Sequence, residues 1–163
     1  MVSDPVDKIL MQWQQERPDL DASAMGIIGR FARLAKHFER ALQATFAEFD
    51  LRPGEFDVLA TLRRSGPPYQ LSPTALFNSM MVSSGTMTHR LDRLEKSGLV
   101  QRQPDPCDRR STLIQLTDKG FDLIEMAVEA HIKNMDRLLK DLDAVEFEAL
   151  ANLLRKLLLS LEA

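Results

Sequence analysis

The chain has 163 residues, of which 44% are hydrophobic and 28% are charged, and this balance argues against an intrinsically disordered protein. A single cysteine excludes an intramolecular disulfide and a cysteine-cluster metal site. We find no signal peptide and no uncharged run long enough to cross a bilayer, so we expect a soluble, cytoplasmic protein. The net charge of −3 does not by itself favour a nucleic-acid partner, but it is unevenly spread: residues 86–110 carry six basic and four acidic side chains, whereas residues 118–163 carry six basic and ten acidic ones.

Two helices are predicted at the N-terminal end. Asp4 followed by Pro5 is typical of a helix start, and this first helix must end before Pro18. Asp21 or Ser23 can cap the second helix, whose apolar positions recur with helical period as far as about Phe49. At 1.5 Å per residue the second helix would be about 40 Å long, more than a small domain covers, so we expect a partner chain.

The middle of the chain predicts three helices followed by a β-hairpin. The first helix spans about residues 53–64, Ser72–Pro73 opens a short helix to about Met80, and Ser83 or Ser84 caps a longer one that stops at Ser97–Gly98. Two short apolar runs, residues 99–100 and 113–116, then flank the turn-forming stretch PDPCDRR. A short helix, a tight turn, a longer helix and a two-stranded hairpin are the order of a winged helix-turn-helix.

Two long helices close the chain. Thr117 is the predicted cap of a helix to about Asp141, and Asp143 with Glu146 forms a capping-box pattern before a leucine-rich last helix. The predicted fold is therefore mainly α, with a winged helix-turn-helix DNA-binding lobe, N- and C-terminal dimerisation helices and a two-stranded β wing. We divide the chain into residues 1–49 (dimerisation and a ligand arm), 50–120 (the lobe) and 121–163 (dimerisation).

The longer helix before the hairpin has one face suited to a major groove. Met87, Leu91 and Leu94 mark its core side, and stepping about 100° per residue places His89 nearly opposite. Small, hydroxyl-bearing and basic side chains on that outer face permit close approach and donate to phosphates or guanine. The candidate DNA-contacting residues of this helix are Ser84, Gly85, Thr86, Thr88, His89 and Arg93. A simple solvated helix face is the alternative.

The hairpin tip carries two adjacent arginines, Arg109 and Arg110, which are candidates for phosphate or minor-groove contact. Asp108 could pair with one guanidinium and fix its direction. Plain surface charge is the alternative for these residues.

The stretch from Leu51 to Gly120, including LSPTALFNSMMVSSGTMTHRLDRLEKSGLVQRQ and the wing ending in LTDKG, resembles the MarR family of dimeric winged-helix regulators. The resemblance extends over essentially the whole chain. It implies that Arg110 enters the minor groove and that Asp108 orients it. The family's wing reads Asp-x-Arg-Asp-x-Arg, and Cys107 stands here where the first arginine is common.

A narrower resemblance is to the urate-responsive branch of that family, in which an N-terminal helix carries a tryptophan before an Arg-Pro-Asp-Leu-Asp-like turn. This chain has Trp13 followed by ERPDLD at residues 16–21. The resemblance implies a ligand set of Trp13, Asp57, Arg90 and Arg102. Helical-wheel geometry places Arg90 about 70° from the core direction, too far inward for a free groove contact. Packing of the indole and an exposed Asp57 are the alternatives.

Taken together, these patterns predict a homodimeric transcriptional regulator, a repressor released from a pseudo-palindromic operator by a small anionic effector that is urate-like, purine-like or phenolic. Two alternatives stay open: a regulator switched by oxidation of Cys107, and a winged-helix module that binds proteins rather than DNA. We find no catalytic constellation, the three histidines are too scattered for a metal site, and we expect no cofactor and no enzymatic activity.

Overall fold

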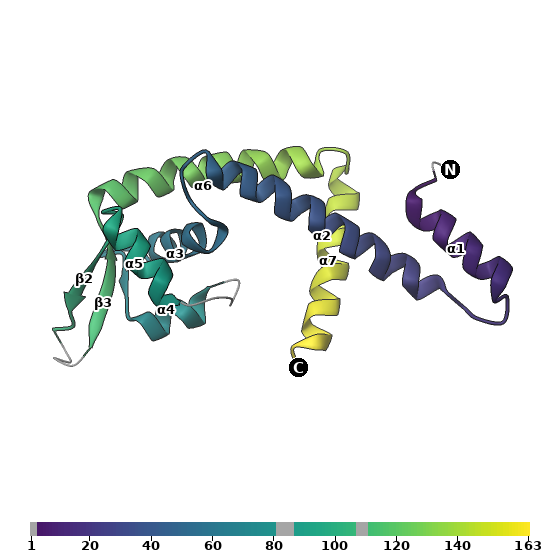
Figure 1. Ribbon diagram of the computed structural model, residues 1–163, viewed down its shortest axis with the longest axis horizontal. Coiled ribbons are helices and arrows are strands. Elements are labelled where there is room, and N and C mark those ends of the chain that lie inside the picture. Colours follow the sequence, from purple (N-terminus) through teal and green to yellow (C-terminus); the bar gives the residue numbers. More distant parts are fainter. Residues whose placement is uncertain (1–2, 81–86, 107–110) are drawn as a thin grey trace. The chain divides into compact units, whose positions relative to one another are not determined.

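The computed structural model describes residues 3–80, 87–106 and 111–163, and the chain divides into two compact units, Met1–Ala41 and Leu42–Ala163 (Figure 1). Each unit is described by itself. The division into residues 1–49, 50–120 and 121–163 concerns roles rather than compactness, and it stays a prediction. In the described part of the chain, no helix combines the length and the apolar character that crossing a membrane requires.

The first unit contains α1 (Pro5–Glu16) and most of α2 (Ser23–Ala47). Asp4 caps α1 as the sequence predicts: its carboxylate accepts from the backbone N–H groups of Val6 and Asp7 at 2.7 and 3.1 Å, and the Asp7 carboxylate accepts from the N–H of Asp4 at 2.8 Å. Arg30 on α2 donates to both carboxylates, at 2.7 Å to Asp4. The guanidinium lowers the pKa of Asp4 below its ordinary value.

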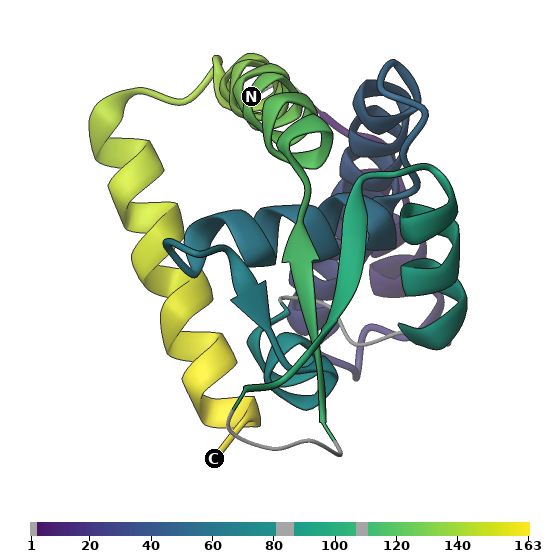
Figure 2. The same ribbon diagram turned by 90° about the vertical axis from the view of Figure 1, so that its left-hand side faces the viewer.

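The second unit contains the predicted winged lobe. The elements of this lobe are α3 (Pro53–Arg64), β1 (Gln70–Leu71), α4 (Pro73–Ser79), α5 (described from Met87 to Lys96), β2 (Val100–Pro104) and β3 (Thr112–Leu116). The three strands lie side by side in Figure 2, in the order β1-β3-β2, with both pairs antiparallel. The sequence predicts only β2 and β3. A third strand of two residues has too few positions to show a period, so tertiary pairing alone defines it.

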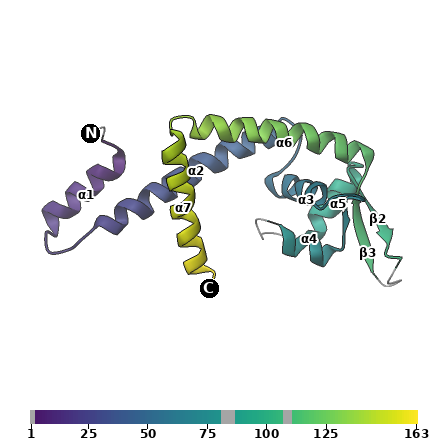
Figure 3. The same cartoon turned by 180° about the vertical axis from the view of Figure 1, so that it is seen from behind.

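The core of the lobe lies where these helices pack on the sheet. Leu59 and Leu62 of α3, Leu94 of α5 and Ile114 of β3 are fully buried, as is Ile124 of α6 (Asp118–Leu139). Burial of Leu91 and Leu94 confirms the core side that periodicity assigns to α5. The lobe thereby holds α5 with its opposite face outward, beside α4 and the hairpin (Figure 3).

The last helix, α7 (Ala144–Leu161), begins at the predicted capping box: the Asp143 carboxylate accepts from the N–H groups of Val145 and Glu146 at 2.8 and 2.9 Å. None of its 18 residues is buried. The described residues therefore leave the apolar side chains of α7 largely exposed.

Candidate nucleic-acid interface

The outward face of α5 is the candidate interface. Thr88 and His89 are exposed on it, whereas Leu91 on the next turn is buried in the core. Three further predicted contacts, Ser84, Gly85 and Thr86, lie outside the described residues and stay predictions. A hydroxyl and an imidazole on one exposed half-turn can both donate to base edges or phosphates.

Arg93, also predicted to meet DNA, already has a partner inside the protein. Its Nε lies 2.7 Å from Oε1 of Glu55, a residue of α3 that is only 2% exposed, and its Nη2 lies 3.9 Å from Asp50. The other oxygen of Glu55 accepts from the N–H of Arg52 at 2.8 Å, which caps α3. A buried carboxylate requires such a cation, so Arg93 joins α5 to α3. A DNA contact by its remaining N–H groups stays a prediction.

Arg102 extends from β2 to the outward face of α5. Its Nη2 lies 2.6 Å from the carboxylate of Asp92, its Nη1 pairs with Glu95, and its backbone N–H donates to Glu95 at 3.3 Å. The hydrogen bond to Asp92 is the main cause that raises the pKa of Arg102 above its ordinary value. Sequence reasoning assigned Arg102 to a ligand and missed these two carboxylates, although Asp92 and Glu95 are three residues apart on one helix.

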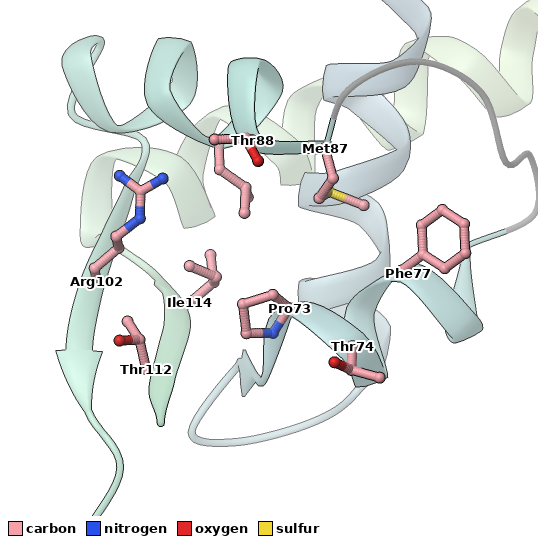
Figure 4. Close-up of a pocket in the computed structure, with 9 residues that line it drawn as sticks. Pro73, Thr74, Phe77, Met87, Thr88, Arg102, Thr112 and Ile114 are labelled. Atoms are coloured by element: carbon pink, nitrogen blue, oxygen red, sulfur yellow. The ribbon is translucent and has the colours of Figure 1, made fainter. Parts of the chain in front are cut away.

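A pocket of about 410 Å³ lies between α4, α5 and the hairpin (Figure 4). Its wall is mostly apolar, and Arg102 brings the one guanidinium among its lining residues. The lining comprises Pro73, Thr74, Phe77, Met87, Thr88, Leu91, Arg102, Thr112 and Ile114. Asp57 and Arg90, the other ligand candidates of this unit, are not in that lining.

Arg90 instead lies against the start of α3. A Cβ at Gly54 would lie 2.4 Å from its guanidinium carbon, so a larger residue there would require the Arg90 side chain to move. Arg90 is half-buried, which agrees with its predicted inward direction. Asp57, three residues after Gly54, has a buried Oδ2 with no hydrogen-bond partner among the described residues. Trp13 is exposed on α1 and belongs to the first unit.

The hairpin tip closes through a backbone hydrogen bond from Asp105 to Ser111 at 3.0 Å. Between them, Cys107, Asp108, Arg109 and Arg110 lie outside the described residues. Their predicted roles in minor-groove contact and in redox sensing stay predictions.

The sequence profile of the MarR family matches residues 51–112, which run from just before α3 to the first residue of β3. The HTH-type transcriptional regulator PecS of Dickeya dadantii is 49% identical over 129 residues, which cover 79% of this chain and 78% of PecS. The chain belongs to the MarR family. Members of this family are DNA-binding transcription regulators and not enzymes. The order of α4, α5 and the β2–β3 hairpin is that of their winged helix-turn-helix.

Solved MarR-family structures share this fold. A cysteine-to-serine variant of MarR from E. coli, complexed with operator DNA, is 27% identical and aligns over 96% of this chain and 99% of its own with a TM-score of 0.70. BpsR of Bordetella bronchiseptica, in a structure that concerns regulation of its DNA binding by 6-hydroxynicotinic acid, is 26% identical over 79% of this chain and 90% of its own, with a TM-score of 0.69.

The MarR-like sequence LTDKG at residues 116–120 has a clear structural reason. Thr117 caps α6 by accepting from the N–H of Gly120 at 3.0 Å, and its hydroxyl donates to the carbonyl of Gly98 at 2.7 Å. Lys119 Nζ donates to the carbonyl of Ser97 at 2.8 Å. These hydrogen bonds join the start of α6 to the turn that ends the recognition helix α5. The sequence analysis identified LTDKG as a family motif but did not predict these bonds.

Proposed function

We propose that this MarR-family regulator acts as a homodimer. The observation that carries the proposal is the unburied apolar surface of α7, because an exposed face of this size in one chain marks an interface. Its exposed apolar residues are Val145, Phe147, Leu150, Leu153, Leu154, Leu157, Leu158, Leu159 and Leu161. In the first unit, α2 exposes a further set, Ile27, Ile28, Phe31 and Leu34. A second copy of the chain supplies matching helices.

In such a dimer, each α5 enters the major groove of one half-site and each wing contacts the adjacent backbone or minor groove. Thr88 and His89 support this because both are exposed on the outer face of α5. Ser84, Gly85, Thr86 and Arg93 complete the proposed groove contacts, and Asp108, Arg109 and Arg110 those of the wing. Two-fold symmetry implies a pseudo-palindromic operator with half-sites about one helical turn apart. Binding there would block transcription, which makes the protein a repressor.

A small anionic effector, urate-like, purine-like or phenolic, releases the operator in this proposal. Arg90 against the first turn of α3 supplies positive charge for such a ligand. Arg102, which lines an apolar pocket, completes the proposed set with Trp13 and Asp57. Arg90 and Arg102 belong to α5 and β2, so an anion bound to them acts directly on the DNA-binding elements. The ligand changes DNA affinity only to the extent that it prefers one conformation.

Fluorescence anisotropy on DNA from the upstream region of the protein's own gene, against scrambled DNA, tests the regulator. Titration of urate or xanthine then tests the effector. Specific binding that the purine reverses supports both parts, and specific binding that neither urate nor xanthine affects keeps the regulator and discards the purine effector. Absence of a specific site, there and in a genomic search, would discard the operator.

Light scattering tests the dimer. We expect Leu154→Asp/Leu158→Asp to shift the protein towards monomer, because both residues lie on the apolar face of α7. Lys156→Asp on the same helix is the matched control and should stay dimeric. A parent protein that is monomeric at micromolar concentration would contradict the proposal.

A further inference from the structure

Two carboxylates lie on the DNA-facing side of the recognition helix. Asp92 follows Thr88 by four residues and His89 by three, and positions with these spacings share one helix face. Glu95 lies one turn further along. Their side chains are 53% and 38% exposed. Left without a cation, they would face the phosphates of any DNA that Thr88 and His89 touch, and like charges brought together at an interface weaken binding.

One side chain pairs with both carboxylates. Arg102 reaches across from β2, with its guanidinium directed towards α5 (Figure 4), and binds Asp92 through Nη2 and Glu95 through Nη1. Its backbone N–H bonds Glu95 as well. Three contacts from one residue of the wing hold it at this position. The group of three side chains carries one negative charge, whereas the two carboxylates alone carry two.

We propose that Arg102 is a positioning residue for DNA binding that acts without touching DNA: by pairing with Asp92 and Glu95, it masks carboxylates that would otherwise repel the phosphate backbone. This role depends on DNA binding by the lobe and is independent of the effector and the operator sequence. If the guanidinium contacted phosphate directly, the variants would behave differently, because removing the carboxylates could not restore the DNA affinity lost with Arg102.

The test is the DNA affinity of the protein on one fluorescein-labelled duplex of about 25 base pairs, at several salt concentrations. We expect Arg102→Gln to weaken binding roughly tenfold at low salt, with a smaller difference at high salt because the repulsion is screened. Arg102→Gln/Asp92→Asn/Glu95→Gln should recover the affinity of the parent. Asp92→Asn/Glu95→Gln, which keeps Arg102, should bind at least as tightly as the parent.

The control is Arg17→Gln, which removes one positive charge from an exposed pair with Asp19 in the first unit. It should change affinity much less than Arg102→Gln. Thermal unfolding establishes that each variant is folded. The proposal is overturned if Arg102→Gln binds like the parent, if the triple variant stays as weak as Arg102→Gln, or if Asp92→Asn/Glu95→Gln loses affinity. The second and third results would assign Arg102 to direct DNA contact or to fixing the wing.

Discussion

Replacing Gly120 by alanine tests the junction between α6 and the end of the recognition helix. A Cβ at this position would lie 1.9 Å from the carbonyl oxygen of Leu99 and 2.8 Å from its carbonyl carbon, both backbone atoms that no rotamer change can move. An ordinary contact needs about 1.5 Å more, so the backbones must separate. That movement stretches the bonds from Thr117 to Leu99 (3.2 Å) and to Gly98 (2.7 Å).

The expected cost follows from these contacts. Strain from overpacking is about 1–3 kcal/mol, and two weakened hydrogen bonds add roughly 1 kcal/mol each. The higher helix propensity of alanine relative to glycine offsets about 1 kcal/mol of this loss. We therefore expect a loss of about 3 kcal/mol in the free energy of unfolding, which for a chain of this size lowers Tm by about 6–12 °C.

Thermal unfolding at equal protein concentration measures this loss, and anisotropy on DNA measures its effect on the recognition helix. Gly29→Ala in α2 is the matched control, since its Cβ would lie an unstrained 3.5 Å from Val6. That variant should be as stable as the parent or slightly more stable. A Gly120→Ala protein with the Tm of the parent would refute the close approach and the reasoning built on it.

Three further predictions concern other parts of the lobe. Arg93→Gln should lower the free energy of unfolding by roughly 2 kcal/mol in urea denaturation, because it leaves Glu55 buried without a cation. Arg93→Gln/Glu55→Gln should recover most of that loss. Loss of DNA affinity at unchanged stability would instead place Arg93 at the DNA. Burial lowers the pKa of His131 below 6.5, and its buried Nδ1 has no hydrogen-bond partner among the described residues. The unfolded chain then binds the proton more readily, so stability should fall as pH drops below about 6.5, and His131→Gln should reduce this slope in urea titrations at a series of pH values. Arg110→Ala should weaken DNA binding broadly and reduce its salt dependence, and unchanged affinity would remove the wing contact.

Local patterns in the sequence determined most of the secondary structure. The predicted caps at Asp4, Ser72, Thr117 and Asp143 all accept backbone hydrogen bonds in the structure. The other described helix ends lie within about two residues of their predicted positions, because capping and apolar periodicity act within a few residues. Strand β2 runs to Pro104, beyond the apolar pair that predicts it, and the predicted start of α5 lies outside the described residues. The family followed from the same stretch, since LTDKG and the helix before the wing are local motifs.

Tertiary structure decided which charged side chains are free to act. Periodicity correctly places Leu91 and Leu94 inside, but it cannot show that Arg93 pairs with Glu55, 38 residues earlier, or that Arg102 crosses from β2 to Asp92. Strand β1 and the room for Arg90 at Gly54 likewise depend on distant partners. A helical wheel gives a direction for each side chain, whereas an ion pair depends on which element the fold brings within about 4 Å of it.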